Sequence, residues 1–134
     1  MGSWTMDRSE WPLVVYAVEG NLSNEELDAF VLDAGQDLAR GERYAVVFDT
    51  TKLGAVSAYM RSRSIQWQRA HTQELAWHCV GTVYVLASPL LRFVAMTVLM
   101  VTRLPTPLKV CERVDEAKSW ALERLQTSGG GSGP

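Results

Sequence analysis

Apolar residues occur along the chain in short continuous runs, separated by segments in which they recur at helical spacing. The runs are rich in β-branched and aromatic residues, which is typical of strands. They predict strands at residues 13–18, 44–48, 82–87 and 108–114, after a short first strand at 4–9. The runs at 13–18, 44–48 and 82–87 are apolar at nearly every position, which indicates burial on both faces, as in the centre of a parallel sheet.

Four segments between these runs have the features of helices. Ser23 precedes Glu26 by three residues, which forms a capping box. Apolar residues at helical spacing follow it as far as Gly41, where a C-terminal cap is expected. Residues 57–77 contain neither proline nor glycine and predict one long helix. The two other predicted helices cover residues 90–104 and 116–126.

The order of these elements predicts an α/β protein. Strands that alternate with helices favour a mainly parallel sheet, here of about five strands, covered by about four helices. The short first strand is expected to pair antiparallel at one edge. With 134 residues, the chain fits a single domain over 4–126. Residues 1–3 are interpreted as a cloning remnant or as disordered, and 127–134 as a flexible Gly/Ser tail.

Composition and charge narrow the class of protein. The chain is 47% apolar and 21% charged, with a net charge of −2, which is typical of a globular domain and does not favour nucleic-acid binding. Two cysteines, Cys79 and Cys111, make no disulfide framework, and no signal peptide precedes the first strand, so we expect a cytoplasmic protein. Residues 90–104 are too few to span a bilayer, so no stable membrane insertion is expected.

Three segments carry a resemblance to a known family. They are residues 13–22 (LVVYAVEGNL), 44–50 (YAVVFDT) and 116–120 (EAKSW). In this order they resemble the STAS domains, which include antagonists of anti-sigma factors, cytoplasmic domains of sulfate transporters, and bacterial STAS-like proteins grouped with Sec14-type lipid carriers. The resemblance covers nearly all of 4–126. It implies a STAS-like fold and a bacterial, regulatory protein that binds other proteins.

The sequence departs from the family at one functional position. Antagonists of anti-sigma factors carry an Asp-Ser-Ser-Gly-like motif after the central strand, and a kinase partner phosphorylates its serine. Here residues 52–59 read KLGAVSAY, so Ser57 is near that place without the flanking Asp and Gly. A phosphoserine at a helix N-terminus is electrostatically favourable. Ser57 is therefore either a phosphoacceptor or, as the altered motif favours, only an N-cap.

The residues suited to catalysis or metal binding do not converge in the sequence. His71 and His78 are about 10 Å apart if they share one helix, too far to bind one zinc ion. No Gly-x-Ser-x-Gly motif or phosphate-binding glycine loop is present. Asp49 ends a strand as in phosphoryl-acceptor domains, but the acidic pair that would bind magnesium is missing, since only Glu19 is available. We therefore expect no enzymatic activity, no metal and no cofactor.

Two surfaces are candidates for binding. The predicted helix at 57–77 offers arginine and aromatic anchors for a protein partner, and its N-terminus could receive an anion; the candidate residues are Thr50, Thr51, Ser57, Arg61, Arg63, Trp67 and Arg69. The alternative is that these side chains only solvate an exposed face. The helix at 90–104 is apolar nearly all round, and its candidate contact or cavity residues are Phe93, Met96, Leu99 and Met100. A second copy, a protein partner, a lipid tail or a neighbouring helix would cover it.

These features favour a non-enzymatic regulatory or scaffolding module that docks to a protein partner or to itself as a homodimer. The first alternative is a carrier or sensor of a small apolar ligand or nucleotide, and the second is an antagonist switched by phosphorylation of Ser57. A docking module should have a packed core and an exposed apolar patch. A carrier should enclose a cavity of several hundred Å³.

Overall fold

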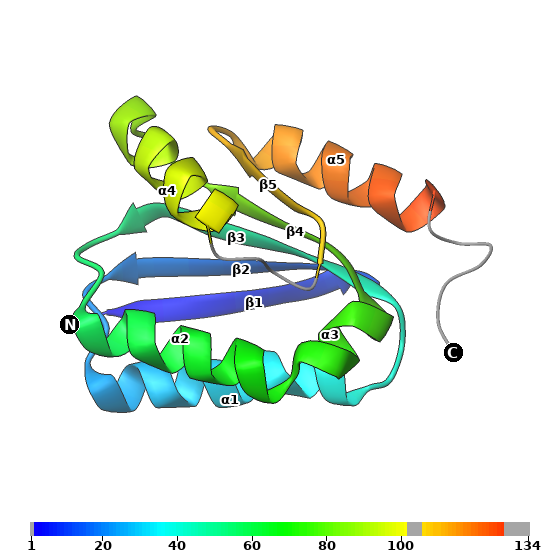
Figure 1. The fold of residues 1–134 in the computed structure, drawn as a ribbon, viewed down its shortest axis with the longest axis horizontal. Coiled ribbons are helices and arrows are strands. Elements are labelled where there is room, and N and C mark those ends of the chain that lie inside the picture. Colours follow the sequence, from blue (N-terminus) through cyan, green and yellow to red (C-terminus); the bar gives the residue numbers. More distant parts are fainter. Residues whose placement is uncertain (1, 102–105, 128–134) are drawn as a thin grey trace.

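The structure is a computed structural model that describes residues 2–101 and 106–127 (Figure 1). Its strands and helices follow the predicted alternation. In chain order they are β1 (Ser3–Glu10), β2 (Leu13–Gly20), α1 (Asn24–Ala39), β3 (Tyr44–Leu53), α2 (Ala58–Ala70), α3 (Thr72–His78), β4 (Cys79–Val85), α4 (Pro89–Val101), β5 (Leu108–Cys111) and α5 (Val114–Thr127). Of the tail predicted at 127–134, Thr127 is the last residue of α5, and 128–134 lie outside the described residues.

The strands form one five-stranded sheet in the order β1-β2-β3-β4-β5. β1 pairs antiparallel with β2, and the other neighbours are parallel. The α/β prediction, with a mainly parallel sheet and an antiparallel edge strand, is therefore confirmed. β1 is longer than predicted, because its eight residues pair along nearly the whole of β2, from Ser3 opposite Glu19 to Glu10 opposite Leu13.

Helices cover both faces of the sheet, and this explains the continuous apolar strands. The first three helices lie on one face, and α5 lies on the other (Figure 1). Along β2 the side chains alternate between two cores: Val14 and Tyr16 pack in the same cluster as Phe30 of α1, whereas Leu13 packs in the same cluster as Ala121 of α5. Burial of both faces of β2, β3 and β4 is what a parallel sheet between helical layers requires.

The predicted helix at 57–77 is wrong in one respect, because it is divided at His71. His71 has φ −122° and ψ 22°, outside the helical region, and separates α2 from α3. Its ring stacks on Trp67 and its Nδ1 lies 2.8 Å from the Trp67 carbonyl oxygen. The break redirects α3, so that Leu75 enters the core beside the start of β4. The helix is broken by this tertiary packing and not by proline or glycine.

Strand ends also differ from the prediction. β3 continues past Asp49 to Leu53, because β2 continues beside it and pairs Glu19 with Lys52. Asp49, which the sequence placed at a strand end, therefore lies inside β3. β4 begins at Cys79, three residues before the predicted start, and β5 ends at Cys111, three residues before the predicted end.

A buried carboxylate joins the edge strand to the first helix. Asp37 of α1 is 1% exposed and accepts hydrogen bonds from the Nε of Arg8 at 2.6 Å and from the Tyr16 hydroxyl at 2.5 Å. The Nη2 of Arg8 also lies 3.2 Å from the carboxylate of Asp33. The hydrogen bond to Asp37 raises the pKa of Arg8, and burial, followed by the bond to Asp37, raises the pKa of Tyr16. β1 is thus attached to α1 by a charged contact in addition to its pairing with β2.

Candidate functional site

Helix α2 is distinguished by its charge. It contains three arginines and no acidic residue, and none of its residues is fully buried. Ser57 begins it as the N-cap: its side chain accepts a hydrogen bond from the Met60 amide at 3.0 Å, as the N-cap interpretation predicted. The helix therefore presents a net positive surface beside α1.

Three exposed residues of α2 form what we call the basic row: Arg61, Ile65 and Arg69. They are four residues apart, so they lie on one face of the helix and extend about 12 Å along it. Ile65 is 41% exposed between the two guanidinium groups. Arg61 donates a hydrogen bond to the Val56 carbonyl oxygen at 3.3 Å, and neither Arg61 nor Arg69 forms an ion pair within the part of the chain that the structure describes.

Arg63 and Trp67, which the sequence grouped with these arginines, face α1 instead. The Nε of Arg63 lies 3.3 Å from a carboxylate oxygen of Asp28. The half-buried Trp67 packs against the core and stacks on His71. These two side chains hold α2 against the domain and leave the basic row exposed.

The structure does not gather the predicted threonines into an anion site with Ser57. Thr50 and Thr51 both lie inside β3. The Thr50 hydroxyl donates to the Val85 carbonyl oxygen at 2.7 Å, and the Thr51 hydroxyl donates to Asp49 at 2.7 Å. Both hydroxyls are therefore engaged within the sheet, because β3 is longer than its apolar run predicted.

We expect replacement of the exposed cap Ser57 with alanine to destabilise the protein by about 1 kcal/mol, because the Met60 amide loses its hydrogen-bond acceptor. Ser57→Asp should retain most of the stability, since aspartate is also a good N-cap and its charge is favourable there. Urea denaturation of the three proteins measures the difference. Equal stability of Ser57→Ala and the parent would contradict this role of the cap.

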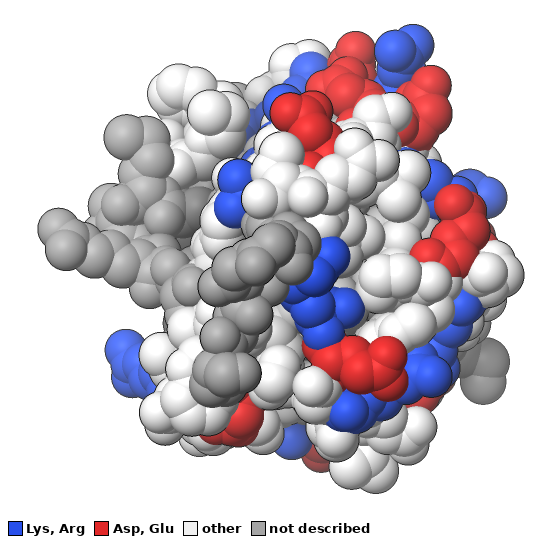
Figure 2. Space-filling view, turned by 90° about the vertical axis from the view of Figure 1, so that its right-hand side faces the viewer, with Lys and Arg blue, Asp and Glu red and all other residues white. Residues whose placement is uncertain are grey.

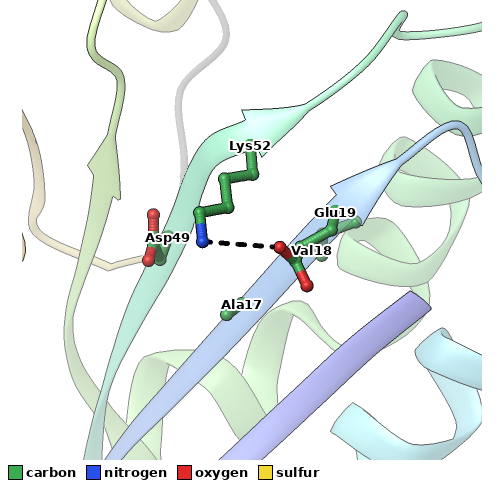
Figure 3. Close-up of a pocket in the computed structure, with 5 residues that line it drawn as sticks. All are labelled: Ala17, Val18, Glu19, Asp49 and Lys52. Atoms are coloured by element: carbon green, nitrogen blue, oxygen red, sulfur yellow. Dashed lines mark ion pairs between the residues drawn. The ribbon is translucent and has the colours of Figure 1, made fainter. Parts of the chain in front are cut away.

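A small hollow lies at the carboxyl ends of β2 and β3, where open α/β sheets commonly bind ligands (Figure 3). Its volume is about 160 Å³, and it is lined by Ala17, Val18, Glu19, Asp49 and Lys52. Lys52 Nζ lies 3.6 Å from a carboxylate oxygen of Glu19, and Asp49 accepts a hydrogen bond from Thr51. The hollow is too small and too polar for a lipid tail. The sequence did not predict it, because Lys52 reaches Glu19 only through the extension of β3.

Helix α4 is the second exposed candidate surface. Leu90, Leu91, Phe93 and Met96 are 69%, 56%, 69% and 53% exposed. The Leu99 and Met100 side chains, which were predicted to share this surface, lie outside the described residues. Within residues 2–101 and 106–127, no helix combines the length and apolar character that crossing a membrane requires.

The potentially reactive groups are dispersed. Cys79 and Cys111 are both buried, and burial raises the pKa of each thiol, which disfavours the nucleophilic thiolate. Among the described residues, no group of three or more His, Cys, Asp or Glu side chains is placed to hold a metal ion. His71 is stacked on Trp67.

One end of the molecule carries charges of both signs. Figure 2 shows the end of the molecule opposite the N-terminus, where Lys and Arg lie beside Asp and Glu. Mixed charges of this kind also occur in the close ion pairs of the domain, such as Lys118 with Glu10 at 2.9 Å. Surface pairs of this type contribute little to stability.

Comparison with known proteins identifies the fold. It is similar to the solved structure of an uncharacterized protein of the DUF3478 family, with a SpoIIAA-like fold, from Shewanella loihica PV-4. The TM-score is 0.69 at 15% sequence identity, over 90% of this chain and 93% of that chain. The predicted STAS-like fold is therefore confirmed. No protein-family model matches the chain, and no curated protein matches it.

Proposed function

We propose that this chain is a non-enzymatic regulatory or scaffolding module that docks through the basic row of α2 to an acidic surface on a partner protein. The observation that carries the proposal is the helix itself, which has three arginines, no acidic residue, and two arginines outside any ion pair of the described residues. Arginine is enriched in the energetically dominant parts of protein interfaces. The exposed Ile65 between the two guanidinium groups adds an apolar contact.

Two observations support docking over the alternative functions. The hollow beside Glu19 and Lys52 is small and polar, so it does not itself provide the closed apolar interior of a lipid carrier. Within the described residues, the buried thiols and the stacked His71 do not converge on one point with an acid or a base. A phosphoswitch at Ser57 remains compatible with docking, because a phosphate there would lie one helical turn from Arg61.

The test compares a double charge reversal in the basic row with a matched reversal elsewhere. Arg61→Glu with Arg69→Glu should abolish capture of the partner from source-cell lysate. It should also weaken binding of that purified partner at least tenfold, because repulsion between like charges replaces attraction between opposite charges. Lys52→Glu with Arg113→Glu makes the same change in net charge at exposed positions outside α2, although each of these residues also loses an ion pair, with Glu19 and Asp115. This control should retain binding, as measured by isothermal titration calorimetry.

Two outcomes would contradict the proposal. One is a partner that both double variants bind as tightly as the parent protein does. The other is that the parent protein captures no protein that the variant with Arg61→Glu and Arg69→Glu fails to capture. Far-UV circular dichroism of both variants establishes that the fold is retained, which is expected because Arg61 and Arg69 are exposed.

A further inference from the structure

Helix α4 has an orientation that is unusual for a helix beside a sheet. Among the side chains of α4 that the structure describes, Leu90, Phe93 and Met96 point away from the domain, and each is more than half exposed. A helix that covers a sheet normally turns its apolar face inward and its charged face to water. Here the outward face is apolar, so an isolated copy of the domain would leave it in contact with water.

The charged residue of α4 explains how the helix is held in this orientation. Arg92 is turned toward the domain, where its Nη1 donates to the carbonyl oxygens of Leu86 and Ala87 at 2.8 and 3.0 Å. Its Nη2 also lies 3.3 Å from a carboxylate oxygen of Glu112. Since Arg92 is the only charged residue in Pro89–Val101, the outward face of α4 carries no charge.

The exposed area matches a substantial part of a protein interface. Leu90, Leu91, Phe93 and Met96 together present on the order of 400 Å², against roughly 800 Å² that each partner buries in a standard interface. Patches of this size on a soluble domain commonly mark interaction sites. The four residues therefore supply about half of one side of a stable interface before their neighbours are counted.

We propose that α4 packs against α4 of a second copy of this chain, in an isologous dimer related by a two-fold axis. An uncharged apolar face is complementary to itself, so this pairing brings no like charges together. Interfaces of homodimers are also more apolar than those of transient complexes. Phe93 and Met96 lie near the middle of Pro89–Val101, which places them close to the axis.

A lipid surface is the less favoured occupant of this face. Helices that lie on membranes combine an apolar face with basic residues that contact the headgroups. The one charge of α4, Arg92, is instead committed to Glu112 and to two carbonyl groups of its own domain. The dimer is also independent of the basic row, which belongs to α2.

Sedimentation equilibrium of the full chain over micromolar to hundred-micromolar concentrations tests the proposal. We expect a dimer, and we expect Phe93→Glu to raise its dissociation constant about thirtyfold or more, as for a central interface residue. Leu32→Glu is the matched control, because Leu32 is 73% exposed on α1, a different helix. It should leave the dimer intact, and so should the double reversal at Arg61 and Arg69.

A second readout does not depend on an inserted charge. Because Cys79 and Cys111 are buried, Met96→Cys should form a disulfide-linked dimer under mild oxidation, whereas Leu32→Cys should form no disulfide between the two copies. A parent protein that is monomeric at every concentration overturns the proposal, as does a dimer that survives Phe93→Glu with its circular dichroism unchanged. Binding of the monomer to phosphatidylcholine vesicles through Phe93 would assign the face to lipid instead.

Discussion

Replacing Asp37 with alanine is expected to lower the free energy of unfolding by about 2–4 kcal/mol, because it removes the buried carboxylate from a charged pair whose arginine is partly exposed. The change leaves Arg8 without the carboxylate that its Nε contacts at 2.6 Å, and leaves the Tyr16 hydroxyl without an acceptor. Asp33 also contacts Arg8 but is partly exposed, so it replaces only part of this interaction. Urea denaturation followed by circular dichroism measures the loss.

Two further variants separate the charge from the hydrogen bonds. Asp37→Asn keeps the shape and one acceptor oxygen, so it should cost less than alanine while still weakening the contact with Arg8. Tyr16→Phe removes only the hydroxyl that donates to Asp37 and should cost about 1–2 kcal/mol. A loss below about 1 kcal/mol for Asp37→Ala would show that Arg8 is fully solvated without its partner.

The fold was predictable because most strands coincide with continuous apolar runs in the sequence, and the helices occupy the segments between or after these runs. The runs at 13–18 and 44–48 lie in the two-sided sheet that their composition predicts. The break at His71 was not predictable, since it depends on stacking against Trp67 and on the docking of Leu75. A sequence without proline or glycine carries no local signal for such a break.

The candidate site was predictable only in part, for a similar reason. Helix spacing alone places Arg61 and Arg69 on one face. It does not reveal that Arg63 is paired with Asp28, because that carboxylate comes from α1, 35 residues earlier. The burial of Asp37 was likewise not predictable from the sequence. An aspartate in a helix is expected on the surface, and Asp37 is buried because Arg8 of β1 contacts it.

Gly81→Ala, in β4, should destabilise the protein by about 1–3 kcal/mol through overpacking. A Cβ atom there would lie 2.9 Å from Cζ3 of Trp120 and 3.3 Å from Cγ of Arg124, both on α5. The indole is a rigid ring between the sheet and α5, so relief requires movement of the helix. Thermal or urea unfolding measures the effect.

A double-mutant cycle and a control substitution that is expected to stabilise the protein can show whether overpacking causes the loss at Gly81. Trp120→Leu removes the ring atoms that a Cβ at position 81 would meet, so Gly81→Ala should cost less in that background than alone. At Gly35, in the interior of α1, a Cβ would lie 3.6 Å from Trp67 Nε1, an ordinary contact. Gly35→Ala should therefore stabilise the protein by about 0.5–1 kcal/mol, through helix propensity and a less flexible unfolded chain. A loss of stability for Gly81→Ala with a gain for Gly35→Ala would attribute the loss at position 81 to the packing of Trp120. Equal losses of stability at both positions would contradict this explanation.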